Sequence, residues 1–328
     1  MAEGEPVLGS IYVYAPNQIA PIFFAIAFAC SAAGHIWQCY RYKAFLLVGL
    51  HPGCAIILTA GYALREYGSF NYLYSHQNLV AFICSQIFIY ICPPALELAN
   101  YHVLSRVFHY VPHLPPLRPN HVMRTFGGLM AIVETLNSVG VSLFANPTAP
   151  QSQLSLGKNL VLAAIIIQLA IIIIFFVMTG IFHFRCAKAG FTRNKTLTTP
   201  LFTLYASMVL IFVRCIYRLV EKTAVKSVWI QDLEELKRLS PLLRYEVFFY
   251  IFEASLMLVN SVMWNIWHPG RFLPRSHRVH LGEDGSVVIT EPKDGKLGKR
   301  PLLLTVGNIL TFGLLDFFVP GEKEKGRE

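Results

Sequence analysis

Carboxylate side chains lie inside three long apolar segments of this 328-residue chain. Glu97, Glu134 and Glu253 stand where a charge facing a bare bilayer would cost at least ~2.5 kcal/mol. Such residues usually face the interior of a helix bundle or a water-filled cavity, and they mark proton, ion or substrate pathways. Burial favours the protonated form of a carboxyl group, so three such acids in one bundle indicate proton coupling.

Polar side chains accompany two of these acids at helical spacing. Asn100 and Tyr101 share a helix face with Glu97, and Asn137 follows Glu134 by about one turn. Each face therefore carries a carboxylate and an amide that would point together into a bundle. A second interpretation stays open, in which each acid pairs with an arginine and only fixes the packing of the helices.

Arginines cluster at the end of a later apolar segment. Arg214 and Arg218 are four residues apart and Glu221 follows three further on, so the three share one helix face. Two guanidinium groups at a membrane boundary are suited to a phosphate or carboxylate headgroup. The alternative is that the arginines extend to the interface and form an internal salt bridge without a ligand.

These observations give two sets of candidate residues. The predicted substrate-binding or transport residues are Glu97, Asn100, Tyr101, Glu134, Asn137, Arg214, Tyr217 and Glu253. The predicted structural or headgroup-binding residues are Arg65, Arg106, Arg218 and Glu221.

No catalytic, metal or cofactor site is predicted. His35 and His51 lie in neighbouring apolar segments and His183 and His268 at segment ends, but no two histidines have the i, i+4 spacing of a metal site on one helix. The chain has no G-x-x-x-x-G-K-[ST] loop for a nucleotide. An enzyme and an ATP-driven pump are therefore not expected.

Seven apolar segments must position the candidate residues. The strongest runs from 160 to 182, with Gln168 as its one strongly polar side chain, and about 20 apolar residues suffice to span a bilayer. Only 14% of the residues are charged, against about a quarter in soluble domains. We predict an all-α membrane protein, a seven-transmembrane helix bundle with spans near 19–40, 44–64, 78–100, 123–145, 159–183, 199–220 and 246–267.

Lys and Arg residues predict the orientation of this bundle. They are absent from residues 1–18 and concentrate in alternate connections, which places the N-terminus outside and the C-terminus in the cytosol. The predicted units are an extracellular segment 1–18, the bundle 19–270 and a basic cytosolic tail 271–328. The tail is polar and expected to be flexible, apart from a possible interfacial helix at 301–319. The net charge of +9 for the whole chain indicates contact with membrane lipids, and no nucleic acid is expected.

A set of motifs follows in order along the chain: Tyr14-Ala-Pro16, His35, Gly61-Tyr62, Arg65, Glu97, Tyr101, Leu104, Arg106, Arg214, Tyr217, Arg218, Glu221, Tyr245-Glu246, Phe248-Phe249-Tyr250, Phe252-Glu253 and His268-Pro269-Gly270. This ordered set resembles the fungal RTA1-like family, also called lipid-translocating exporters. Asn17 stands where the family usually has serine, and Glu253 where it commonly has aspartate. The fourth-span pattern lacks the family's glutamine.

This resemblance implies a seven-helix protein of the plasma membrane or another endomembrane. It implies export or flopping of sphingoid long-chain bases or toxic amphiphiles, so the partners expected are membrane lipids and an amphipathic small molecule. One branch of the family is linked to porphyrin or haem transport, which is an alternative. A seven-helix receptor or sensor of lipid-like ligands is a second alternative, and an intramembrane hydrolase with a metal-bound water is a third.

Overall fold

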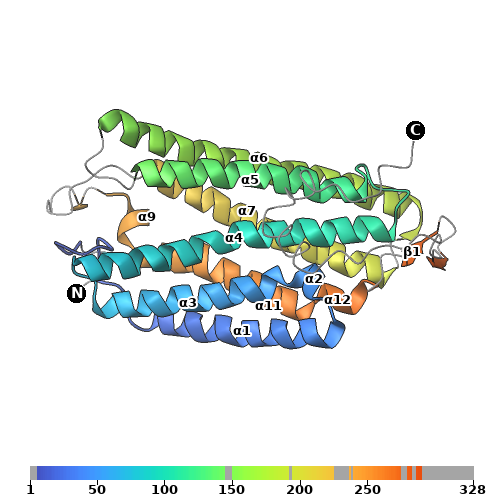
Figure 1. The fold of residues 1–328 in the computed structure, drawn as a ribbon, viewed down its shortest axis with the longest axis horizontal. Coiled ribbons are helices and arrows are strands. Elements are labelled where there is room, and N and C mark those ends of the chain that lie inside the picture. The colour runs from blue at the N-terminus through green and yellow to red at the C-terminus, as the bar shows by residue number, and fades with distance from the viewer. Residues whose placement is uncertain are drawn as a thin grey trace, which may run out of the picture.

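The computed structural model of the chain is a bundle of long helices (Figure 1). It describes residues 6–144, 150–191, 194–224, 236–237, 239–274, 279–282 and 286–289. The long helices are α1 (Ala20–Tyr42), α3 (Leu50–Phe70), α4 (His76–Tyr110), α5 (Pro119–Phe144), α6 (Gln151–Lys188) and α7 (Lys195–Ala224). A seventh long helix, which we call the composite helix, consists of α10 (Glu246–Phe249), the π-helix η2 (Tyr250–Ser255) and α11 (Leu256–Ile266). The short helices are α2 (Phe45–Val48), α9 (Pro241–Arg244) and α12 (Pro269–Phe272).

Six helices of the described residues are long and apolar enough to cross a membrane. They are α1, α4, α5, α6, α7 and the composite helix, and the predicted all-α membrane fold is confirmed. The second predicted span, 44–64, corresponds to α2 and the 21-residue α3, which begins at Leu50. At about 31 Å, α3 has the length of a span but is not among the six. The seventh span and the orientation of the termini therefore stay predictions.

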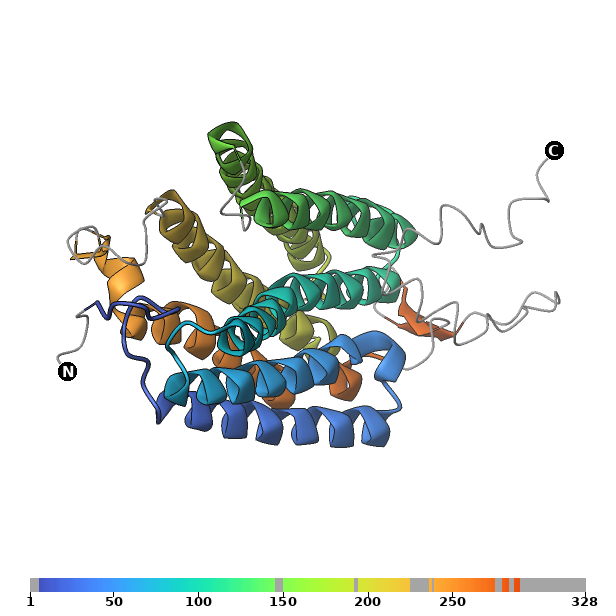
Figure 2. The same cartoon turned by 60° about the vertical axis from the view of Figure 1, so that its left-hand side comes forward.

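The helices form a closed ring with one contact through its middle. Around the ring, α1 packs on α3, α3 on α4, α4 on α5, α5 on α6, α6 on α7, α7 on α11 and α11 on α1. Because α4 also packs on α7, the ring is divided into two sub-bundles that share these two helices. Both views place α4 between the α5–α6 pair and the α1–α3 pair (Figures 1 and 2). We call them the α1–α3–α11 side and the α5–α6 side.

The composite helix changes its hydrogen-bonding pattern at a candidate residue. Its π-helical segment Tyr250–Ser255 contains Glu253. A π-helical turn holds more residues than an α-helical turn, and such turns occur frequently at functional sites. Nothing in the spacing of the apolar residues predicted it.

Part of the C-terminal tail is ordered. Strands β1 (Val279–Leu281) and β2 (Val287–Ile289) pair antiparallel, and β1 packs against α4. The prediction of a uniformly flexible tail is therefore wrong for these residues, because Leu281 is buried against the end of the bundle. The predicted interfacial helix 301–319 lies outside the described residues.

Gly140 allows α5 to approach α6 closely. A Cβ atom there would lie 2.8 Å from Cγ2 of Val161 and 2.9 Å from the carbonyl oxygen of Gly157. We expect Gly140→Ala to lower the free energy of unfolding by about 1–3 kcal/mol, because backbone atoms must move apart. Thermal unfolding of purified protein in detergent measures this. Gly128→Ala, on the same helix with no atom within 4 Å, is the matched control and should not destabilise.

Candidate functional site

A buried ion pair joins α7, which both sub-bundles share, to the composite helix. Nε of Arg214, on α7, lies 2.6 Å from Oε1 of Glu253, and the exposed fractions of the two side chains are 6% and 0%. Each partner alone would be an uncompensated charge in the membrane, so the pair stabilises both. The structural pairing considered for Glu253 is thus observed, with Arg214 as its partner. The second carboxylate oxygen of Glu253 is buried and has no hydrogen-bond partner among the described residues.

Glu97 is held without any cation. It is fully buried on α4, accepts a hydrogen bond from the hydroxyl of Tyr101, and accepts a second at 2.7 Å from Nε2 of Gln168 on α6. No ion pair joins Glu97 to a described residue, although Arg214 lies within electrostatic range. The carboxylate is therefore oriented by neutral groups and remains able to take a proton or a cation.

Glu134 lies on the neighbouring helix and is half-buried. It is close enough to Glu97 and Arg214 for electrostatic interaction, but it forms no ion pair with a described residue. Asn137, about one turn further on α5, is also half-buried and has no hydrogen bond within the described part of the chain. Glu97 and Glu134 therefore lie within electrostatic range of each other and of Arg214, which is already paired with Glu253.

A neutral polar contact lies between α4, α7 and α11 in the interior of the bundle. The side-chain amide of Asn100 donates to Oγ of Ser207 at 2.8 Å, and Nε1 of Trp264 donates to the same oxygen at 3.1 Å. All three residues are buried. Asn100 was predicted as a transport residue, and the structure places it in a tether between helices, on the face shared with Glu97.

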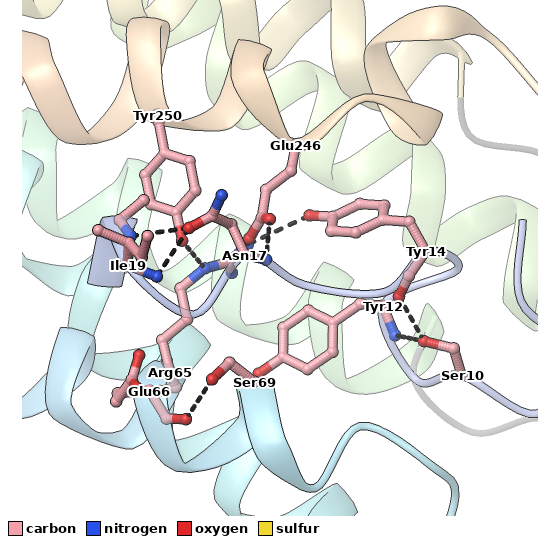
Figure 3. Close-up of polar contacts among 12 residues, drawn as sticks. Ser10, Tyr12, Tyr14, Asn17, Ile19, Arg65, Glu66, Ser69, Glu246 and Tyr250 are labelled. Carbon is pink, nitrogen blue, oxygen red and sulfur yellow. Dashed lines mark hydrogen bonds and ion pairs between the residues drawn. The ribbon is translucent and has the colours of Figure 1, made fainter. Parts of the chain in front are cut away.

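Arg65 belongs to a different cluster at the predicted outer end (Figure 3). Its Nη2 lies 2.8 Å from Oε1 of Glu246 and 3.1 Å from the hydroxyl of Tyr14, and its Nε donates to the hydroxyl of Tyr250 at 3.2 Å. Oε2 of Glu246 accepts from the backbone N–H of Asn17 at 2.7 Å. Burial raises the pKa of Tyr14, so this hydroxyl stays neutral and Glu246 alone balances the arginine. Arg65 thus ties the N-terminal segment to the bundle.

The remaining arginines have protein partners. Arg218 forms a salt bridge with Glu221, and its guanidinium carbon lies 3.9 Å from the ring centroid of Tyr90. This arrangement is the internal salt bridge that was considered as the alternative to binding a headgroup. Tyr217 stacks on Phe252 with centroids 5.3 Å apart. Arg106 lies away from the candidate site and donates to the carbonyl of Pro274.

Some residues that contact the candidate site residues could not be assigned from the sequence. Gln168 is the one strongly polar residue of its apolar segment, but nothing in the sequence indicates its hydrogen bond to Glu97. Ser207, which bonds to Asn100, gave no sequence signal. Glu246 and Tyr14 carried the family resemblance but were not connected with Arg65, from which they are distant in sequence. No group of three or more potential metal ligands converges among the described residues.

Comparison with known proteins gives the family of this chain. The profile described as RTA1 like protein matches residues 53–276. The chain belongs to the RTA1-like family. It is 53% identical over 315 residues to a protein of Leptosphaeria maculans named "Lipid-translocating exporter-like protein RTA1", covering 94% of this chain and 60% of that relative. No solved structure gives a significant match.

Two further relatives agree with this assignment. A protein of Ajellomyces capsulatus with the same name is 31% identical over 67% of this chain and 68% of its own length. "Probable lipid transporter atnI" of Emericella nidulans is 24% identical over 81% of this chain and 69% of its own length. This RTA1-like chain is an integral, multi-pass membrane protein.

The ion pair predicts a non-additive effect on stability. Arg214→Gln leaves Glu253 buried without its cation and should lower the free energy of unfolding by about 3–5 kcal/mol. The double variant Arg214→Gln, Glu253→Gln removes both charges and should recover most of this loss. Thermal unfolding of the single and double variants completes the cycle. Additive losses would contradict a direct interaction.

The outer cluster predicts that Glu246 holds the N-terminal segment in place. Glu246→Gln removes the negative charge that balances Arg65 and that accepts the hydrogen bond from the backbone N–H of Asn17. Residues 6–19 should therefore exchange amide hydrogens faster. Hydrogen–deuterium exchange measures this, with the exchange of α5 as the internal reference. Unchanged exchange in residues 6–19 would show that other contacts are sufficient.

Proposed function

We propose that this protein is a transporter or floppase that exports amphipathic, amine-bearing lipid-like molecules such as sphingoid long-chain bases. The observation that carries the proposal is the pair Glu97 and Glu134, two carboxylates inside a membrane bundle without an ion-pair partner among the described residues. Lipid-transporter names among the relatives support the class of cargo.

Charge balance around Arg214 favours a cation. Glu97 and Glu134 both lie within electrostatic range of the Arg214 guanidinium, but that guanidinium is paired with Glu253. An ammonium headgroup would supply the missing positive charge and three hydrogen-bond donors. A neutral or anionic headgroup would leave the two acids to be neutralised by protons alone.

The same acids offer a way to couple movement to protons. A carboxylate that binds an ammonium group loses its affinity once it is protonated, so protonation from one side would release the cargo there. Glu97 suits this role because its hydrogen bonds from Tyr101 and Gln168 fix its position in either state. The apolar chain of the cargo would stay in contact with the bilayer, where α6 exposes many isoleucines.

Reconstitution tests the proposal directly. Purified protein in liposomes should move a fluorescent long-chain base between leaflets faster than empty liposomes do. Glu97→Gln and Glu134→Gln should each slow this about tenfold or more, the effect of losing a charge-assisted hydrogen bond of ~1.5–3 kcal/mol. Glu66→Gln, a carboxylate of α3 away from this region, is the matched control.

The cargo itself provides a second control. An N-acylated analogue of the same chain length has no positive charge and should not be accelerated. No acceleration of the free amine over empty liposomes would refute the proposal. Equal acceleration of the acylated analogue would refute the role of the acids in recognising a cation, and saturable movement of a porphyrin in place of the amine would refute this choice of cargo.

A further inference from the structure

A second group of buried polar side chains lies on the α1–α3–α11 side, apart from the proposed cargo site. Both polar atoms of the Asn260 amide, both ring nitrogens of His51 and Nδ1 of His35 are buried without a hydrogen-bond partner among the described residues. The exposed fraction of each of these residues is 1% or less. They come from α11, α3 and α1, which pack on one another.

Leaving so many buried polar atoms unbonded would be costly. Each buried donor or acceptor without a partner costs about 1–3 kcal/mol, so these five atoms alone would match the whole stability of an ordinary domain. Groups of this kind in native proteins are normally satisfied by ordered water, which bridges two to four polar atoms. Asn, His and Ser side chains provide the required mixture of donors and acceptors.

The polar groups continue from the middle of the bundle to its inner end. His35 and His51 lie with ring centroids 5.6 Å apart, and His51 is 5.1 Å from Trp264. Nε2 of His35 lies 3.3 Å from Oγ of Ser261, next to Asn260. Both histidines are within electrostatic range of His268, at the predicted cytosolic end.

In the other direction the same face leads to the ion pair. Asn260 follows Glu253 by seven residues, about 10 Å along the helix. The carboxylate of Glu253 lies within electrostatic range of Tyr62. Oε2 of Glu253 and the hydroxyl of Tyr62 are both buried without a hydrogen-bond partner among the described residues. Between Glu253 and Asn260, at one turn from each, stands the buried Met257.

We propose that a file of water molecules runs along His35, His51, Asn260 and Tyr62, and that it carries protons between the cytosolic end and Oε2 of Glu253. The file is the proton route of the proposed transporter, and to that extent it rests on the proposed function. A proton enters from bulk water near His268, passes along hydrogen-bonded waters and side chains, and ends on Oε2 of Glu253. The reverse transfer returns it to the cytosol.

Protonation of Glu253 has a specific effect on the cargo site. The carboxyl group becomes neutral, so the ion pair with Arg214 is lost and the guanidinium keeps its charge. Arg214 is then free to interact with Glu97 and Glu134, which lie within its electrostatic range. The guanidinium would compete with an ammonium headgroup for these acids, so one proton on one sub-bundle favours release of the cargo from the other.

The titratable groups close to His35 and His51 are histidines and cysteines. His35 and His51 face each other and His268, with Cys39 on α1 4.0 Å from Nε2 of His268. Cys54 on α3 and Cys92 on α4 bond to each other's carbonyl oxygens. No carboxylate, lysine or arginine of the described residues forms a hydrogen bond or ion pair with these histidines.

Hydroxyl-radical footprinting tests for the water without requiring transport. Radicals generated from bound water oxidise adjacent side chains, so Met257 and Trp264 should be labelled although their exposed fractions are 1% and 0%. Phe108 and Phe182, buried against each other with centroids 4.7 Å apart, are the dry reference. Asn260→Leu and His51→Phe, of similar volume, should reduce labelling of Met257 severalfold. Labelling of Met257 and Trp264 at the level expected for dry burial would overturn the proposal.

Proton flux tests the function of the file. In liposomes with a trapped pH dye, addition of a long-chain amine should change the internal pH faster with the protein than without it. Asn260→Leu and His51→Phe should reduce this protein-dependent proton flux about tenfold while equilibrium binding of the amine is retained. Flux at the level of the unsubstituted protein in both variants would refute the file as the proton route. Failure of the unsubstituted protein to bind or move the amine would instead refute the proposed function, and footprinting would still decide whether the file exists.

Discussion

The membrane interior does not tolerate an unpaired charge, and the Arg214–Glu253 pair meets this constraint at the centre of the bundle. The pair is made between α7, which both sub-bundles share, and the π-helical part of the composite helix, and both side chains are buried. The charge on the shared helix is therefore held by a charge of the α1–α3–α11 side. Any change in the protonation of Glu253 is felt on both sides, because the low dielectric of the interior does not screen it.

The other charged groups divide into two kinds. At the predicted outer end, Arg65 has Glu246 and two tyrosine hydroxyls around it, and near the same end Arg218 has Glu221 and the ring of Tyr90. These clusters are internally balanced and hold segments together. Glu97 and Glu134 are different, because their neighbours are polar but neutral or already paired. The imbalance is local, and a mobile proton or a bound cation can correct it.

The sequence predicted the kind of fold well because bilayer thickness leaves few choices for long apolar segments. The composite helix near 246–267 is recovered with similar bounds, while the helix around Gln168 is longer at both ends than the predicted span 159–183. Pairing of acids with arginines was left open as one interpretation, and the sequence did not indicate the partners. Arg65 and Glu246, for example, are 181 residues apart and are brought together only by the fold.

Other features had no sequence signal. The π-helical turn at Glu253 depends on hydrogen bonds that helical periodicity does not reveal. Gln168 was visible as an isolated polar residue, yet its partner is determined by the rotation of α6 against α4. The buried histidines suggested a metal site too weakly to be assigned, and their neighbours prove to be Ser261 and Trp264.

The length of α6 affects how well the helix matches the thickness of the bilayer. Its 38 residues extend about 57 Å, and its apolar run 160–182 covers about 35 Å, which exceeds the ~30 Å hydrocarbon core of an average bilayer. The energetic cost of hydrophobic mismatch is a fraction of a kcal/mol per ångström, and it falls in thicker, sterol-rich bilayers. The excess length of this helix therefore favours either a tilt across an average bilayer or a bilayer that is thicker around the protein.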